Sequence, residues 1–370
     1  MKTKISFVVV LMVGILSWSC NKTDNLKTPQ AQVSLKSALT QGVQQLTTAV
    51  SAITTSTGYQ VVTGPADLMT KDAVVSPFDT ITRTILLADI AGIYDYKAVL
   101  FRRGFMPVMR FFNKVADTTV MVVRLPEEKI KGSRSLLHYA ASDTLLANNY
   151  QITVTDYQFI FNHSTGTTYQ MASKTKIKGI EAGVFKIQSS HNKTTGYHFA
   201  SEFDFPNGYI TKCYYTPGDT AISVYAISDG TKTLYEEKYT AIKTSTSNRH
   251  REKEFSLTIG DVMIVRQLGH TQASLDSAKV YVAGVLQTKA KVEIVDKATG
   301  TPPVDDVDKC VSNKQRELKI TFDDGTSKTF TELAGSVITD ISSLFASLRQ
   351  ANFGTAIVDW IAWDIYYKKI

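Results

Sequence analysis

Residues 197–242 read YHFASEFDFPNGYITKCYYTPGDTAISVYAISDGTKTLYEEKYTAI, and this stretch decides the fold class. Runs rich in Val, Ile, Thr and Tyr alternate with turn sequences at Pro206-Asn207-Gly208, Pro217-Gly218-Asp219 and Asp229-Gly230. Asn-Gly and Asp-Gly favour the positive-φ turns of tight hairpins, and connections this short join antiparallel neighbours. The stretch therefore predicts an antiparallel meander.

The same chemistry continues on both sides of this stretch. Strand-like runs occur at 80–87, 90–100, 105–112 and 118–125, become regular from residue 150, and resume at 254–259, 262–267 and 278–295. A hairpin is expected across Asp324-Gly325. Apolar residues spaced by three and four predict amphipathic helices over 35–53, with Ser34 as N-cap, and over 337–348. Residues 357–367 fit a buried strand or a helix equally. We expect an α+β fold, mainly an antiparallel β-meander sheet with an amphipathic helix near each end of the mature chain.

The N-terminus has the pattern of an export signal. A basic Met1-Lys2-Thr3-Lys4 precedes an apolar run from Ile5 to Leu16 and then Ser17-Trp18-Ser19-Cys20. As a helix, the fourteen residues from Ile5 to Trp18 would span about 21 Å, short of the roughly 30 Å hydrocarbon core of a membrane. A cleaved signal is thus favoured over a permanent membrane helix.

This segment resembles the signal peptide of bacterial lipoproteins of the Bacteroidota type. The resemblance implies cleavage before Cys20 and acylation of Cys20 with chains such as palmitate, and Asn21 resembles the residue that follows the cysteine in proteins sent to the outer membrane. It implies an outer-membrane protein held to the membrane by lipid. The alternative is an ordinary cleaved signal with a chance cysteine.

The chain divides into four stretches by composition. Residues 1–19 are the expected signal peptide and residues 20–33 a polar tether. Residues 34–243 form the region of the first helix and the meander, and residues 254–370 a β-rich region with a C-terminal helix. The polar, basic stretch 244–253 separates the last two, which fit two regions or one continuous domain equally.

Composition limits the functional classes. The chain has 370 residues, of which 43% are hydrophobic and 20% charged, so it can bury a core and is not generally disordered. Loss of residues 1–19 removes Lys2 and Lys4, leaving 39 basic and 34 acidic residues, a net charge of +5. Export and this small excess argue against nucleic acid as a partner.

Two cysteines remain in the mature chain after Cys20. Export would place Cys213 and Cys310 in an oxidising compartment, where a bond closing so long a loop would contribute roughly 4–5 kcal/mol. The alternative is two separate buried thiols, because a free cysteine behaves as a small apolar residue. The sequence leaves both open.

The sequence contains no motif that identifies an enzyme. It lacks a G-x-S-x-G elbow and the glycine-rich loops that hold phosphates. His191 and His198 flank one turn and could share a metal, but no third ligand is evident, so we expect no metal site, no cofactor and no catalytic residue. A non-enzymatic binding or assembly component is favoured over an envelope hydrolase.

Two kinds of ligand are compatible with such a protein. Exposed tyrosines of the meander could stack on sugar rings, and the candidates are Tyr209, Tyr215, Tyr225, Tyr235 and Tyr239. A curved sheet with helices could instead enclose an apolar ligand, as carrier folds do. An envelope protein partner is the third expectation, and packing between strands is the alternative role for the tyrosines.

Five triplets consist of an Asp, then a Ser or Thr, and then a small or aliphatic residue. They are similar to the O-glycosylation acceptor of exported Bacteroidota proteins. A turn Asp that leads into a strand produces the same triplet without any modification. The acceptors that the resemblance implies are Thr80, Thr118, Thr144, Thr220 and Ser277.

Overall fold

The computed structural model describes residues 34–62, 82–98, 108–131, 145–192, 194–244, 251–268, 278–296, 316–335, 337–349 and 353–369. Residues 34–370 form one compact unit, separate from residues 1–33. The expected signal peptide, the tether and Cys20 lie outside the described residues.

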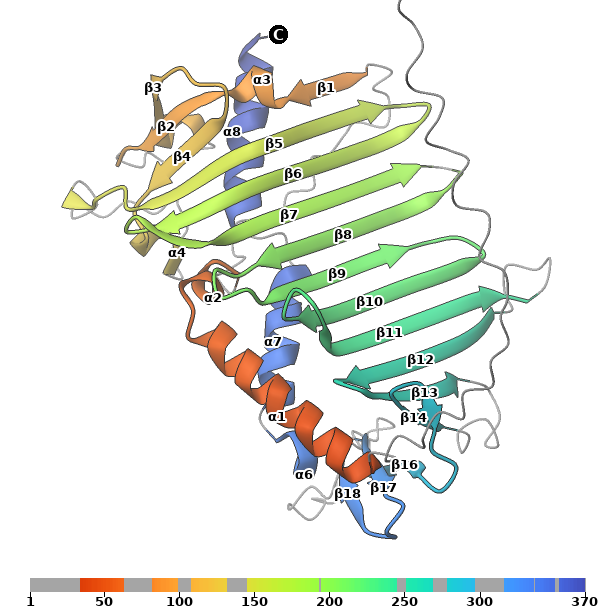
Figure 1. The fold of residues 1–370 in the computed structure, drawn as a ribbon. Helices are drawn as coiled ribbons and strands as arrows, with labels where there is room; N and C mark the ends of the chain where they lie inside the picture. The colour runs from red at the N-terminus through yellow and green to blue at the C-terminus, as the bar shows by residue number, and fades with distance from the viewer. Residues whose placement is uncertain are drawn as a thin grey trace, which may run out of the picture. The chain divides into compact units, whose positions relative to one another are not determined.

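A large sheet runs through this unit and confirms the predicted fold class (Figure 1). Its path is β15-β14-β13-β12-β11-β10-β9-β8-β7-β6-β5-β4-β2-β3, and β1 pairs with β5. From β4 to β15, consecutive strands lie side by side and antiparallel. The strands are β1 (Arg83–Leu86), β2 (Gly92–Tyr96), β3 (Phe112–Ala116), β4 (Met121–Leu125), β5 (Tyr150–Asn162), β6 (Gly166–Ile177), β7 (Ile180–Asn192), β8 (Gly196–Asp204), β9 (Ile210–Thr216), β10 (Thr220–Ser228), β11 (Thr233–Lys243), β12 (Arg251–Ile259), β13 (Val262–Leu268), β14 (Lys279–Val282) and β15 (Val285–Leu286).

The predicted turns join consecutive antiparallel strands. Gly208 has φ 87° between β8 and β9, and Gly230 has φ 86° between β10 and β11. Most other residues avoid this backbone region, which explains the glycines. β11 and β12, which flank residues 244–250, pair from Tyr235 with Ile259 to Lys243 with Arg251 and so belong to one sheet.

One strand pair departs from the antiparallel pattern. β2 pairs with β3 antiparallel on one side and with β4 parallel on the other. The chain turns back through β3 before β4, so β4 runs in the direction of β2 and fills its free edge. A second, small sheet has the order β16-β17-β18, with β16 (Lys291–Asp296), β17 (Arg316–Thr321) and β18 (Ser327–Thr329).

The first predicted helix is α1 (Leu35–Thr54). The Ser34 hydroxyl accepts a hydrogen bond from the Ser37 backbone N–H at 3.2 Å, as an N-cap should. The apolar side of α1 is buried against β11, β12 and β13, and α2 (Thr57–Val62) packs against β7. Gly42 allows the close approach of α1, because a Cβ there would lie 2.8 Å from the Ile259 carbonyl oxygen of β12.

Two helices close the chain. α7 (Val337–Arg349) matches the second predicted helix, and α8 (Phe353–Lys369) shows that residues 357–367 are helical. The other described helices are short: α3 (Leu87–Ile90), α4 (Glu128–Lys131), α6 (Phe330–Ala334) and the 3₁₀ turn η1 (Val108–Phe111). Among the described residues, helices long and apolar enough to cross a membrane are absent.

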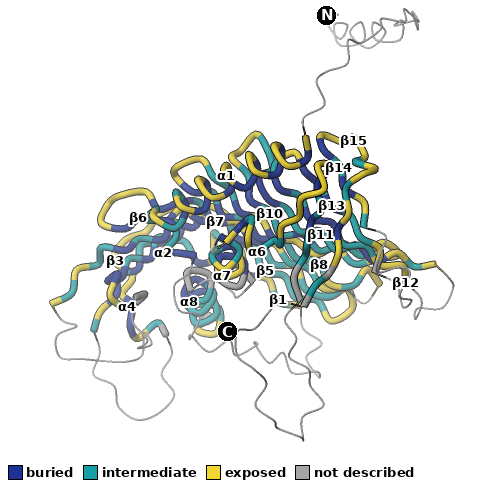
Figure 2. Tube along the Cα trace, turned by 90° about the horizontal axis from the view of Figure 1, so that it is seen from below, coloured by how far each residue is buried: buried dark blue, intermediate teal, exposed yellow. Residues whose placement is uncertain are grey.

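The described helices that pack on the meander lie against the same face. The hydroxyls of Tyr157 and Tyr169 donate to Asp359 of α8, and Tyr225 packs against Phe345 of α7. Figures 1 and 2 show where α7 and α8 lie beside the sheet. Because side chains alternate along a strand, residues in phase with these three share the helix-bearing face. Residues out of phase lie on the opposite side, here named the open face because none of the described helices contacts it.

Candidate functional site

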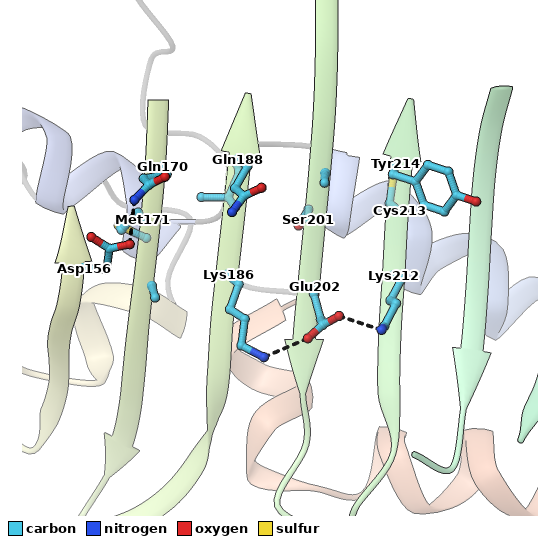
Figure 3. Close-up of a pocket in the computed structure, with 13 residues that line it drawn as sticks. Asp156, Gln170, Met171, Lys186, Gln188, Ser201, Glu202, Lys212, Cys213 and Tyr214 are labelled. Carbon is cyan, nitrogen blue, oxygen red and sulfur yellow. Dashed lines mark hydrogen bonds and ion pairs between the residues drawn. The ribbon is translucent and has the colours of Figure 1, made fainter. Parts of the chain in front are cut away.

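A slot on the open face is centred on Ala200 of β8. Gln188 of β7 and Tyr214 of β9 stand directly opposite Ala200 on the two neighbouring strands. Strands lie about 4.8 Å apart, so these neighbours are separated by about 10 Å across β8. Alanine has no side chain beyond its Cβ, and Figure 3 shows the Tyr214 ring directed from β9 toward the next strand, so the space above Ala200 stays open.

Glu202 closes one end of the slot, two residues along β8. Its carboxylate bonds Lys186 at 2.8 Å through Oε1 and Lys212 at 2.8 Å through Oε2, and Lys186 also pairs with Asp204 at 2.9 Å. Figure 3 shows Lys186, Glu202 and Lys212 in a row across three strands. Exposed pairs of this kind contribute little to stability. Their effect is to orient the Glu202 carboxylate toward the slot's end.

Glu202 is ionised in this arrangement. Partial burial opposes its charge, but the hydrogen bonds from Lys186 and Lys212 outweigh burial and hold the pKa of Glu202 below its usual range. Hydrogen bonds to Asp204 and Glu202 raise the pKa of Lys186. A carboxylate has about four acceptor positions, so Glu202 can still accept from a ligand hydroxyl.

Two adjoining hollows surround the slot. One measures ≈ 380 Å³ and includes Glu202 and Lys212, and the other measures ≈ 370 Å³ and includes His198. Gln170, Gln188, Ala200 and Tyr214 line both. Gln170 stands opposite Gln188, and Figure 3 shows both amides level with Tyr214. The combination of amides, a carboxylate and one aromatic ring suits a hydroxyl-rich, uncharged ligand.

An aromatic plate lies on the helix-bearing face of the same strands, formed by Tyr197, Phe199 and Tyr215. The Tyr197 ring is stacked on Phe199 at 6.4 Å and on Tyr215 at 6.5 Å, with interplanar angles of 18° and 25°. Tyr197 is 47% exposed and Tyr215 is 37% exposed. The Tyr197 ring is therefore nearly parallel to both of its neighbours, and the three rings form a partly exposed aromatic group.

A carboxyl group with a raised pKa lies elsewhere on the helix-bearing face. Asp359 of α8 accepts hydrogen bonds from the hydroxyls of Tyr157 and Tyr169, each at 3.0 Å. Loss of solvation between α8 and the sheet raises the pKa of Asp359 to about 7, although the two hydrogen bonds oppose the shift. One turn later, Trp363 packs on Phe159 at 4.8 Å. The cluster attaches α8 to β5 and β6.

The tyrosines predicted from the sequence lie in different surroundings. Tyr215 belongs to the plate, while Tyr225 and Tyr235 pack against Phe345 of α7. Tyr209 lines a hollow of ≈ 350 Å³ beside α1, and Tyr239 is partly buried. The structure therefore brings only one of the five to an exposed aromatic surface.

The two histidines beside the β7–β8 turn do not share a site. His191 pairs with Tyr197 and His198 pairs with Ser190, so the two imidazoles are on opposite faces of the sheet. The described part of the chain holds no group of three or more His, Cys, Asp or Glu residues arranged for a metal ion.

The other candidate residues predicted from the sequence are only partly within the described residues. Cys213 is buried on β9, and Cys310 lies outside the described residues, so their disulfide stays a prediction. Thr118 is exposed between β3 and β4, and Thr220 is exposed at the start of β10. Thr80, Thr144 and Ser277 lie outside the described residues, and modification at all five acceptors stays a prediction.

Sequence reasoning missed most residues of the slot and the plate. Ala200, Gln188 and Tyr214 carry no motif, and their grouping depends on which residues pair across three strands. The available signal was the phase of β8 and β9: Phe199 and Ala200 must lie on opposite faces, as must Tyr214 and Tyr215.

Comparison with known proteins gives no relative: the chain matches no family model, no curated protein and no solved structure.

Proposed function

We propose that this protein is a lipid-anchored protein of the outer membrane that binds an uncharged glycan at the Ala200 slot, without catalysing a reaction on it. The anchor is supported by the sequence that ends at Cys20. The observation that carries the binding function is the open slot between Gln188 and Tyr214, with Glu202 at its end.

A sugar ring has the chemistry that these groups recognise. Its C–H face can pack on the Tyr214 ring, which is 36% exposed, and its hydroxyls can bond the Gln188 amide and the Glu202 carboxylate. Three of the charged groups beside the slot are already paired as Lys186–Glu202–Lys212, and the Asp156 carboxylate accepts a hydrogen bond from the Gln170 amide. This pairing favours an uncharged ligand over an anionic one.

The two rival functions have less support. The hollows at the slot open to the surface and include charged and amide side chains, which do not suit an apolar cargo. Asp359 has the raised carboxyl pKa expected of an acid catalyst, but it is bonded to Tyr157 and Tyr169 on the other face of the sheet. Its position supports a structural role in attaching α8.

Filling the slot tests the proposal. In Ala200→Leu the larger side chain would occupy the space between Gln188 and Tyr214. The matched control is Ala226→Leu, because Ala226 lies opposite Lys212 on the open face but lines neither hollow. Thermal melts of both variants would establish that they fold.

The measurement is calorimetric titration of the full chain in detergent with hexasaccharides of α- and β-linked glucose, of mannose, of xylose and of N-acetylglucosamine. We expect at least one to bind, Ala200→Leu to weaken binding at one site tenfold or more, and Ala226→Leu to leave all binding unchanged. Binding of none of the five, or equal binding by wild type and Ala200→Leu, would overturn the proposal.

A further inference from the structure

The aromatic plate is placed back to back with the slot. Phe199 and Ala200 are consecutive on β8, and Tyr214 and Tyr215 are consecutive on β9. In the register of these strands Phe199 pairs with Tyr215 and Ala200 pairs with Tyr214. The same two strands therefore present an aromatic surface on one face and the slot on the other.

The plate is a partly exposed group of nearly parallel rings. The ring plane of Tyr197 differs by 18° from that of Phe199 and by 25° from that of Tyr215, and the two tyrosines are 47% and 37% exposed. Elsewhere on this face the described helices cover aromatic rings, as Phe345 covers Tyr225 and Tyr235. Exposed aromatic groups that lie together are unusual on a soluble surface and mark binding sites.

The neighbours of the plate indicate what it binds. Tyr197 pairs with His191, Phe199 with Ser189, and Tyr215 with Ser223. These three strand partners are one histidine and two serines, with no lysine or arginine among them to attract an anionic lipid surface. Exposed aromatic rings beside serine hydroxyl groups can pack on the C–H face of a sugar ring and bond its hydroxyls.

We infer that the plate is a second saccharide site, so that one molecule holds two glycan chains, one on each face of the β8–β9 pair. The second site rests on the plate alone, whereas bridging also rests on the proposed function of the slot. A protein with two such sites links neighbouring chains, and binding at one site raises the effective concentration of a long chain at the other. This gives the expected assembly role a physical mechanism.

The test counts bound ligands by native mass spectrometry of the full chain released from detergent micelles. The probes are the five hexasaccharides named above. Wild type should bind two molecules of at least one hexasaccharide, Ala200→Leu should bind one, and the double variant Tyr197→Ala/Tyr215→Ala should also bind one. The triple variant Tyr197→Ala/Ala200→Leu/Tyr215→Ala should bind none.

Further variants separate a binding effect from a folding effect. Tyr215→Trp retains an aromatic ring and should still bind two ligands, and thermal melts should place each variant close to wild type. If the double variant still binds two ligands, the plate is not a saccharide site. The same conclusion follows if wild type binds one ligand and Ala200→Leu binds none. If wild type binds one ligand and the double variant binds none, the plate is a site and the proposed function of the slot fails instead.

Discussion

Replacement of Asp359 by asparagine should make the protein more stable at neutral pH. The folded state raises the pKa of Asp359 from 3.8 to about 7, because α8 and the sheet remove water from the carboxyl group. The folded protein thus binds a proton more tightly than the unfolded chain does. The stability from this group is fully present below about pH 4 and is lost as pH rises toward 7.

The magnitude follows from the two pKa values. A difference of about 3 units, at about 1.36 kcal/mol per unit, corresponds to about 4 kcal/mol, and the residual exposure of Asp359 lowers this to about 2–4 kcal/mol. Asparagine keeps an acceptor oxygen for the Tyr157 and Tyr169 hydroxyls and carries no charge. At pH 8, Asp359→Asn should therefore be about 2–4 kcal/mol more stable than wild type, and at pH 4 the two should be nearly equal.

Chemical denaturation of wild type and variant at pH 4, 5, 6, 7 and 8 measures this difference. Subtracting the wild-type stability from that of the variant cancels the contributions of groups whose pKa is lowered by folding, such as Glu202 and Asp324. Their contributions to stability vanish in acid, opposite to that of Asp359. Asp364→Asn is the matched control: it lies on the same helix and accepts from the Met109 N–H at 2.8 Å. It reports the effect of replacing a carboxyl group of α8 away from Tyr157 and Tyr169. A constant difference between Asp359→Asn and wild type from pH 4 to 8 would refute the reasoning.

Three further substitutions test the fold and the anchor. Gly42→Ala should destabilise the protein by about 1–3 kcal/mol in thermal melts despite alanine's better helix propensity, because its Cβ would lie 2.8 Å from a backbone carbonyl of β12. The control is Ser51→Ala at an exposed position of the same helix, which should change stability by less than about 0.5 kcal/mol. Gly208→Val should lower the free energy of unfolding by about 1–3 kcal/mol, because it places a β-branched residue at φ 87°. The control Thr165→Val, at an exposed position outside the positive-φ region, should lower it far less. Equal melting temperatures for Gly208→Val and wild type would contradict the turn assignment. Cys20→Ser should abolish acylation, so the protein should leave the membrane fraction or remain uncleaved; a normally processed variant that stays in the membrane would exclude the lipid anchor.

The meander could be predicted because its information is local. Each tight turn is specified by its own residues, as the positive φ of Gly208 and Gly230 illustrates, and short connections leave few choices for strand order. The α8 segment was ambiguous because its apolar residues surround the helix rather than forming one stripe: Trp360, Ile361 and Ala362 are consecutive and all at least partly buried. Period therefore could not distinguish a helix from a buried strand there.

The slot and the plate could not be predicted because they depend on register between strands. Ala200 becomes the floor of a slot only when Gln188 and Tyr214 stand opposite it, and neither pairing is encoded in the turn sequences alone. The sequence suggested five tyrosines as candidates for stacking. Their surroundings differ because Phe345 of α7 packs on Tyr225 and Tyr235, whereas Tyr215 is partly exposed.

The packing of the core determines which face of β8 and β9 carries the plate and which face carries the slot. Phe203 of β8 is fully buried beside α2, where a Cβ on Gly58 would lie 3.0 Å from its ring, and burial of such a side chain contributes about 1.5–3 kcal/mol. Phe203 and Phe199 are in phase on β8, so the packing of Phe203 places Phe199 on the helix-bearing face and Ala200 on the open face. A slip of one residue would bury Glu202 beside α2 in place of Phe203 and exchange the two surfaces. The arrangement of the two proposed sites is thus a consequence of the same apolar contact that holds β8 against the helices.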